Sequence, residues 1–179
     1  MLIKAGSVTN LTDARFFAAY DVDYMGFCFD PQSPDYISPT QALAISGWIS
    51  GPKIVAELGN QDAENVKAII EFFNPDIIQI KESEIHLLNG NDHLPLIVET
   101  ESIRDTLKPE NVLFYLLPFD QINAEFDPPA YYMVDISNAP SFDPLTTKIS
   151  AIQLKGSPEQ EIGLKSFDKI AELLDVMKR

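Results

Sequence analysis

Residues 24–29, YMGFCF, decide the fold, because they hold no charged side chain and no polar group apart from the tyrosine hydroxyl. A strand with one solvated face alternates apolar and polar residues, whereas a continuous apolar run is typical of a strand covered on both faces, as in a parallel sheet. Residues 112–117, VLFYLL, have the same character. Working outward from these two runs, we expect eight strands, at residues 2–5, 24–29, 53–57, 76–80, 96–99, 112–117, 131–136 and 151–154.

The segments between the expected strands carry helix signals. Ser38, Pro39 and Gln41 predict a capping box with proline in the first helical position. Asn10 and Ser102 are further candidate N-caps, each followed three residues later by an aspartate. Apolar residues spaced i, i+3, i+4 and i+7 between 66 and 73, and again between 170 and 177, predict helices that pack one face on the sheet.

This alternation of strands and helices is the pattern that builds parallel sheets through crossover connections. Eight parallel strands favour a closed (β/α)8 barrel, the TIM barrel, since an open sheet of this width would leave two edges unpaired. Such barrels typically hold about 250 residues, whereas this chain has 179. We therefore expect a single α/β domain over residues 1–179, a compact and trimmed barrel whose late helices are short or missing.

The composition narrows the classes of function. The chain holds 27 acidic and 13 basic residues, a net charge of −14, which disfavours nucleic acid and anionic membranes as partners. With Cys28 as the single cysteine and two histidines, we expect no internal disulfide, no metal cluster of zinc type and no cofactor. No apolar run is long enough for a membrane span or a secretory leader, so we expect a cytoplasmic protein. A monomer and a homo-oligomer both stay open.

In a (β/α)8 barrel the active face is formed by the carboxyl ends of the strands and the loops that follow them. Asp135 ends an apolar run there, and is either a general acid at the barrel mouth or the cap of the next turn. Asp30, Glu57 and Glu99 also follow strands, and these carboxylates are candidates for holding a hard divalent cation, with solvated side chains as the alternative.

Other polar residues have a structural and a functional interpretation. Lys4 lies within the first expected strand; pointing inward, its ammonium needs a carboxylate partner, in a structural ion pair or a catalytic arrangement. Cys28 lies on the same side of its strand as Gly26 and is interpreted as a core residue rather than a nucleophile or base. Gly156 and Ser157 precede an expected helix, where backbone amides can hold an anion.

Three stretches resemble the phosphoribosylanthranilate isomerase family. Residues 4–42, KAGSVTNLTDARFFAAYDVDYMGFCFDPQSPDYISPTQA, are similar to that family's opening, in which a KICGITN-like strand leads to a DA-containing helix, a GADALGFVF-like strand and an SPRYVSP-like loop. PDIIQIKESE at 75–84 is similar to its LDIVQLHGDE segment, and GSPEQEIGLKSFDKI at 156–170 to its SGVExxPGxKDxxKI segment. The matching positions in the opening are Lys4, Thr9, Asn10, Asp13, Ala14, Asp23, Gly26, Phe27, Phe29, Ser33, Pro34, Tyr36, Ser38 and Pro39.

The resemblance implies a single-domain (β/α)8 isomerase of tryptophan biosynthesis. The family's reaction is an Amadori rearrangement of aldose-to-ketose type, which needs a general acid and a general base across the mouth. Gly6 stands where the family has the cysteine that acts as its general base, and Asp35 stands where the family has an arginine that binds the substrate carboxylate. The acid corresponds to Asp135 by local similarity, or to Asp120 by strand count. The family's glycine-rich phosphate loops after strands six and seven have no counterpart here.

Lys4, Gly156 and Ser157 are the candidates for contacts with a substrate. Three functions stay open at this point. The chain is an isomerase of tryptophan biosynthesis, or a catalytically inactive barrel (a pseudoenzyme) that binds a small molecule at its mouth or a partner. The third function is a different enzyme on the same scaffold, assisted by a metal held by Glu57, Glu99 and Asp135.

Overall fold

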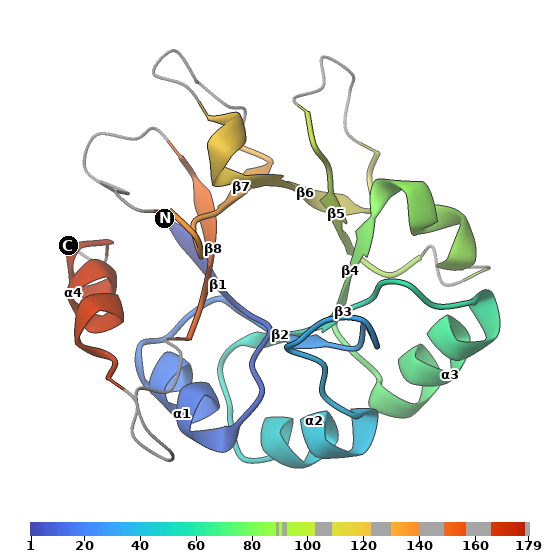
Figure 1. Cartoon of the computed structure of the whole chain (residues 1–179), viewed down its shortest axis with the longest axis horizontal. Helices are drawn as coiled ribbons and strands as arrows, with labels where there is room; N and C mark the ends of the chain where they lie inside the picture. The colour runs from blue at the N-terminus through green and yellow to red at the C-terminus, as the bar shows by residue number, and fades with distance from the viewer. Residues whose placement is uncertain are drawn as a thin grey trace.

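The computed structural model describes residues 1–88, 90, 93–102, 109–122, 130–139, 149–156 and 166–177. Eight strands form a closed barrel in sequence order (Figure 1). They are β1 (Leu2–Gly6), β2 (Tyr24–Cys28), β3 (Lys53–Glu57), β4 (Ile77–Lys81), β5 (Leu96–Glu99), β6 (Val112–Pro118), β7 (Tyr132–Asp135) and β8 (Ala151–Lys155). The expected α/β barrel and all eight expected strands are confirmed, each strand to within about one residue at either end.

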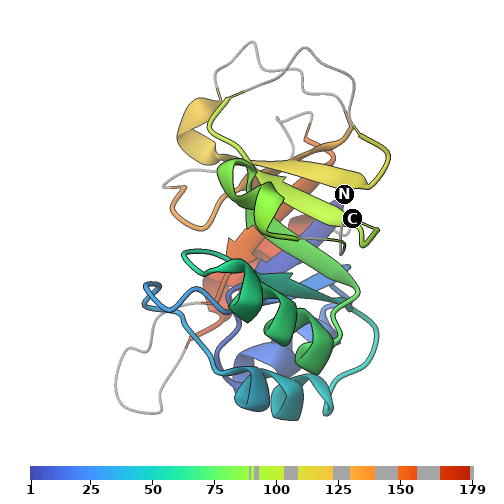
Figure 2. The same ribbon diagram turned by 90° about the vertical axis from the view of Figure 1, so that its right-hand side faces the viewer.

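The first and last strands close the barrel. β1 and β8 are parallel partners over five positions, from Leu2 beside Ala151 to Gly6 beside Lys155. The other neighbouring strands also pair in parallel. The carboxyl ends of all eight strands therefore meet at one mouth, and the two ends of the chain lie on the same side of the barrel (Figures 1 and 2).

The long helices gather around the first half of the barrel. α1 (Leu11–Ala19), α2 (Pro39–Ser46) and α3 (Ala63–Phe73) stand side by side around β1 to β4 in Figure 1, and α4 (Asp168–Met177) lies beside α1. β4 and β6 are followed by the short 3-10 helices η1 (Glu82–Leu88) and η2 (Phe119–Gln121). None of the helices within the described ranges combines the length and apolar character that a bilayer crossing requires.

Two of the predicted caps are confirmed. The Asn10 side chain accepts a hydrogen bond from the backbone N–H of Asp13 at 2.9 Å, and so begins α1. Ser38 and Gln41 form the full capping box at the start of α2, with Pro39 as the first helical residue. The third predicted cap, from Ser102 to Asp105, extends outside the described residues.

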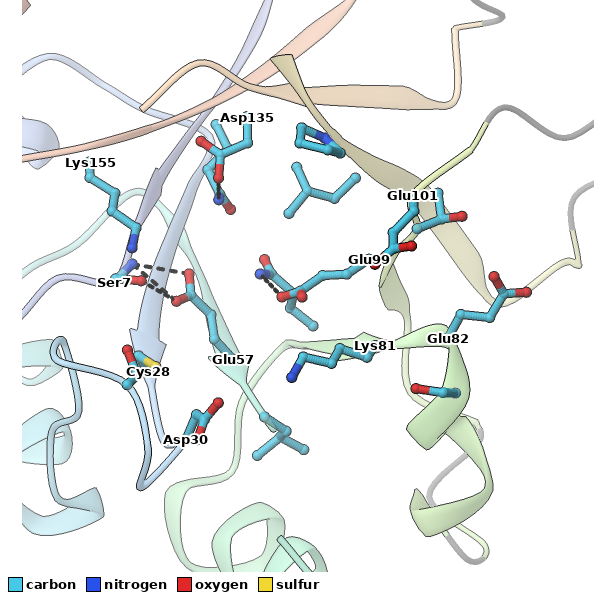
Figure 3. Close-up of a pocket in the computed structure, with 18 of the residues that line it drawn as sticks. Ser7, Cys28, Asp30, Glu57, Lys81, Glu82, Glu99, Glu101, Asp135 and Lys155 are labelled. Atoms are coloured by element: carbon cyan, nitrogen blue, oxygen red, sulfur yellow. Dashed lines mark hydrogen bonds between the residues drawn. The ribbon is translucent and has the colours of Figure 1, made fainter. Parts of the chain in front are cut away.

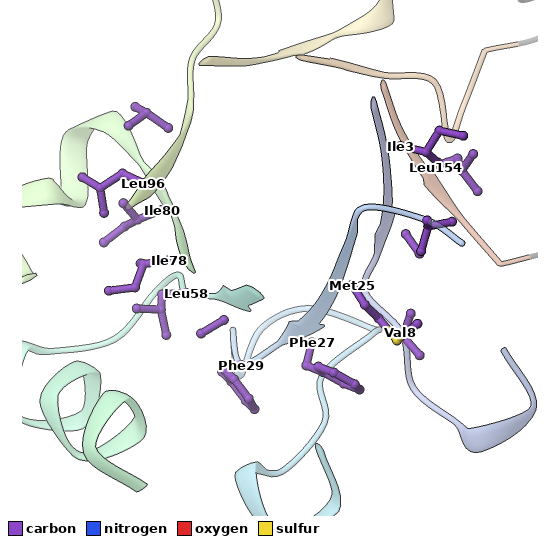
Figure 4. Packing of buried hydrophobic residues seen from close by; sticks show 14 of the residues in the cluster. Ile3, Val8, Met25, Phe27, Phe29, Leu58, Ile78, Ile80, Leu96 and Leu154 are labelled. Carbon is purple, nitrogen blue, oxygen red and sulfur yellow. The ribbon is translucent and has the colours of Figure 1, made fainter. Parts of the chain in front are cut away.

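Two apolar cores sandwich the barrel wall. The larger lies between the strands and the helices, and Phe27 and Phe29 are among its members (Figure 4). Phe73 of α3 packs edge-on against both rings. The smaller fills the interior at the amino-terminal side of the strands, and consists of Val55, Ile77, Ile97, Phe114, Leu116, Met133 and Ala151. Strand side chains thus face apolar surroundings on both sides, which explains the continuous apolar runs of the sequence.

Two residues further along most of these strands, the interior becomes polar. Lys4 is fully buried, and its Nζ donates hydrogen bonds to Oε1 of Glu57 and to Oε1 of Gln153, both at 2.5 Å. Glu57 also accepts from the backbone N–H and the hydroxyl of Ser7. A buried charge is tolerated only with a partner of opposite sign and with its remaining hydrogen bonds filled, as here. The structural interpretation of Lys4 is the one the geometry supports.

Gly26 makes room for this ion pair. A Cβ atom placed on Gly26 would lie 1.9 Å from Oε1 of Glu57 and 2.9 Å from Nζ of Lys4. No atom can be tolerated at such a separation, and neither charged group can move away without losing its partner inside the barrel. β2 therefore requires glycine at this position for reasons of packing.

We expect Gly26→Ala to lower the free energy of unfolding by about 3 kcal/mol or more, the range seen when a buried ion pair is broken. Urea unfolding followed by circular dichroism measures this loss. Gly47→Ala is the matched control, because Gly47 has a helical φ of −64° and its nearest neighbour would lie at 3.4 Å. Equal stability of the two variants would contradict the packing role of Gly26.

Candidate functional site

A cavity of about 840 Å³ opens at the carboxyl ends of the strands (Figure 3). Every strand contributes to its lining, either through its last residues or through the segment that follows it. The lining residues of the described chain that carry charge are Asp30, Glu57, Lys81, Glu82, Glu99, Glu101, Asp135 and Lys155. The volume suits a small organic molecule.

The charges of this cavity are mostly negative. Six carboxylates and two ammonium groups line it within the described ranges. Lys155, at the end of β8, is already paired with Asp35 of the β2–α2 loop at 2.7 Å. Burial lowers the pKa of Lys155, but the hydrogen bond and charge of Asp35 outweigh burial and the net pKa is raised. One of the two lysines is thereby held in an ion pair across the mouth.

Asp135 belongs to a chain of hydrogen bonds that starts at the buried lysine. Gln153 accepts from Lys4 and donates through Nε2 to Oδ2 of Asp135 at 2.8 Å. The other carboxylate oxygen of Asp135 accepts from the backbone N–H of Ser137 at 2.9 Å. The two interpretations of Asp135 are therefore compatible, since it caps the turn toward Ser137 and also faces the cavity.

Glu99 and Gln79 form a second polar pair on the cavity floor. Gln79 is 3% exposed and donates through Nε2 to Oε1 of Glu99 at 2.7 Å. Burial raises the pKa of Glu99, and the nearby charge of Glu57 raises it further; the hydrogen bond from Gln79 and the charges of Lys4 and Lys81 oppose this without cancelling it. A carboxyl group with a raised pKa in a cleft is a recognised mark of a functional position.

Cys28 is buried, as predicted, and its position also places it on the cavity wall. Burial raises the pKa of its thiol; hydrogen bonds from Ser33 and Asp30 oppose burial, and the charges of Glu57 and Asp30 act with it. The thiol is therefore protonated at neutral pH and is a poor base or nucleophile.

Among the other predicted site residues, the structure distinguishes those that line the cavity from those that do not. Asp120 lies exposed in η2 and is not among the residues that line the cavity, whereas Asp135 is. Lys4 lies beneath the floor, engaged by Glu57, so its ammonium does not line the cavity as expected of a substrate contact. Gly156 follows β8 and is half-buried, and Ser157 lies outside the described residues.

Of the two alternatives for Asp30, Glu57 and Glu99, the cation site is not supported in the described part of the chain, where no three histidine, cysteine or acidic side chains are grouped to hold a metal ion. The physical reason is that each carboxylate has another partner. Glu57 binds Lys4 and Ser7, and the two oxygens of Asp30 accept from Gln32 and Asn60. Glu99 and Asp135 accept from the glutamines.

Two residues of the site escaped the sequence analysis, Gln79 and Gln153. Each is the one polar residue within an otherwise apolar strand core, at a position that alternation places inside the barrel. That isolated amide within a buried strand was the available signal, since buried polar side chains need partners.

A closed barrel of eight parallel strands with a polar cavity at its carboxyl mouth defines the chain as a (β/α)8 barrel. Comparison with protein-family models finds no match. Among curated proteins, the phosphoribosylanthranilate isomerase of Thermotoga petrophila is 29% identical over 117 residues, which cover 63% of this chain and 56% of that protein. The isomerase of Rhizobium meliloti is 29% identical over 133 residues, covering 70% of this chain and 60% of that protein.

Solved structures agree on the fold. Phosphoribosylanthranilate isomerase from Thermus thermophilus superposes with a TM-score of 0.70 at 20% identity, covering 98% of this chain and 97% of that one. The enzyme from Thermotoga maritima gives a TM-score of 0.69 at 18% identity over 99% and 98% of the two chains. The chain is thus similar in sequence and in fold to phosphoribosylanthranilate isomerases, and its sequence matches little more than half the length of the curated relatives.

The raised pKa of Glu99 makes stability depend on pH in a defined direction. The folded state holds this proton more tightly than the unfolded state, so the contribution of Glu99 is most favourable below the ordinary pKa of 4.5 and is lost as pH rises through the folded pKa. Glu99→Gln keeps the acceptor for Gln79 and removes the charge. We expect this variant to be more stable than the parent protein at pH 8, by a margin that shrinks toward pH 4.5.

Urea unfolding at several pH values between 4.5 and 8 measures this difference. Glu101→Gln is the control, because Glu101 is exposed on the same segment. A gain for Glu99→Gln that stays constant over this range, or that Glu101→Gln shares, would contradict the assignment.

Proposed function

We propose that the mouth cavity binds a small polar ligand, and that the chain does not turn over phosphoribosylanthranilate at a rate useful for tryptophan biosynthesis. The observation that carries this proposal is the ion pair between Asp35 and Lys155. By the resemblance, Asp35 replaces the arginine that receives the substrate carboxylate, and it also occupies a lysine at the mouth.

The charge of the family's substrate fits this cavity poorly. One related structure contains reduced 1-(o-carboxyphenylamino)-1-deoxyribulose 5-phosphate, a compound with a carboxylate and a phosphate. Within the described ranges of the present chain, six carboxylates line the corresponding mouth, against two lysines of which one is paired. A like-charge contact near 4 Å costs about 1 kcal/mol in water and about 4 kcal/mol near a protein surface.

The space that the family's cysteine base would need at position 6 is occupied by the side chain of Gln153. A Cβ atom on Gly6 would lie 3.0 Å from Cδ of Gln153, and Gln153 is fixed by its hydrogen bonds to Lys4 and Asp135. A cysteine at position 6 would therefore press on the polar network. Loss of a general base typically lowers a rate by about 10²- to 10⁴-fold.

The second candidate function is the isomerisation for which the curated relatives are named. One geometric observation favours it: Cys28 of β2 and Asp135 of β7 line the same cavity and are a thiol and a carboxyl group for the two proton transfers. The raised pKa of the Cys28 thiol weakens it as the base. This leaves ligand binding without the family reaction as the better-supported function.

A direct assay decides between these candidates. We expect the purified protein to give no turnover of phosphoribosylanthranilate above the uncatalysed rate, and no growth of a tryptophan auxotroph that lacks the isomerase. The Thermus thermophilus isomerase, assayed in parallel, is the positive control. Turnover that is abolished by Cys28→Ser or Asp135→Asn would overturn the proposal and establish the family reaction.

A further inference from the structure

We propose that the ligand of the mouth cavity carries a primary ammonium group, which binds on the cavity floor between the amide oxygen of Gln79 and the carboxylate of Glu99. This inference rests on the proposal that the mouth is a ligand site. It adds the chemical class of the ligand, an organic amine.

Gln79 provides the first argument. Its hydrogen bond to Glu99 uses Nε2 and so fixes the orientation of the amide. The amide oxygen Oε1 is then buried, and no residue in the described ranges donates a hydrogen bond to it. A buried acceptor without a donor costs about 1 to 3 kcal/mol. Gln79 is among the residues that line the cavity, so a ligand donor that reaches this amide oxygen would supply the missing bond.

Glu99 provides the second argument. The deeper carboxylates of Glu57 and Asp135 each accept hydrogen bonds on both oxygens from protein groups. Glu99 receives one bond, on Oε1, and within the described chain no donor reaches its Oε2. Glu99 therefore has capacity for a ligand, and its other oxygen is bonded to the same Gln79 amide that carries the unfilled acceptor.

The chemistry of these two acceptors selects the ligand group. An ammonium has three donors and no acceptor, so one group can bond Gln79 and Glu99 together. A hydroxyl has a single donor, and a carboxylate has none at neutral pH. A hydrogen bond between an ammonium and a carboxylate is also about twice as strong as a neutral one. The negative balance of the lining charges favours the same ligand class.

The ammonium of Lys81 bears on amine binding, because Lys81 lines the cavity at the end of β4, two residues beyond Gln79. Figure 3 shows its side chain directed into the cavity, below Glu99 in that view. A ligand amine and the Lys81 ammonium repel each other, so Lys81→Met is expected to strengthen amine binding. Unchanged or weaker amine binding by this variant would contradict the expected repulsion.

Paired probes test the inference. Each pair has the same skeleton and differs in the amine: glucosamine against glucose, and putrescine against 1,4-butanediol. Titration calorimetry and NMR shift mapping measure affinity and location on the full chain. We expect each amine to bind at least tenfold more tightly than its hydroxyl counterpart, with shifts at the carboxyl ends of β4 and β5.

Two variants sharpen the test. Glu99→Gln keeps the hydrogen bond with Gln79 and removes the charge, and Gln79→Met removes the amide oxygen at similar size. Both are expected to weaken amine binding at least tenfold, while Glu64→Gln, an exposed position on α3, leaves it unchanged. Thermal unfolding of each variant verifies that it is folded.

Equal affinity for amines and hydroxyl compounds, no binding of either, or equal effects of Glu99→Gln and Glu64→Gln would overturn the inference. Its failure is distinguishable from failure of the proposed function, which is measured separately as turnover of phosphoribosylanthranilate. An amine-selective site together with such turnover would uphold the floor site and refute the loss of the family reaction.

Discussion

The buried ion pair between Lys4 and Glu57 is the constraint on which the rest of the site depends. Two charges inside a barrel of apolar strands are stable only when each has its partner and its remaining hydrogen bonds filled. Ser7 and Gln153 fill those bonds, and Gly26 leaves the space in which the two groups meet. Five of the eight strands are coupled through this pair, because Gln153 of β8 also holds Asp135 of β7.

The pair also divides the interior into two layers. Below it, apolar side chains fill the barrel. Above it, the strand ends present mostly carboxylates to a cavity large enough for a small molecule. The barrel fold explains why the cavity is at this end, while in our proposal the charges at its rim and floor determine which ligands it accepts. On that proposal, Asp35 with Lys155 at the rim disfavours anions, and Gln79 with Glu99 on the floor favours a donor group.

Much of the fold could be predicted because its signals are local. An apolar run such as residues 112–117 predicts a buried strand from its own composition, and the capping box at Ser38 fixes a helix start through bonds that span three residues. The candidate site was harder to predict. Asp135 was found at the mouth because it ends a strand, but the same reasoning grouped Asp30, Glu57 and Glu99 as cation ligands. Strand ends meet at one mouth, yet position along the chain does not say which partner each carboxylate takes.

The sequence by itself determined the eight strands, the closed parallel barrel and the resemblance to the isomerase family, since periodicity, capping and local motifs depend on neighbours along the chain. Only the tertiary structure decided that Lys4 forms its ion pair with Glu57, 53 residues away, and that Asp35 is paired with Lys155, 120 residues away. It also revealed the unfilled acceptor on Gln79. The physical reason is that charge pairing and hydrogen-bond satisfaction act over a few ångströms in space, and barrel closure brings together groups that no sequence pattern relates.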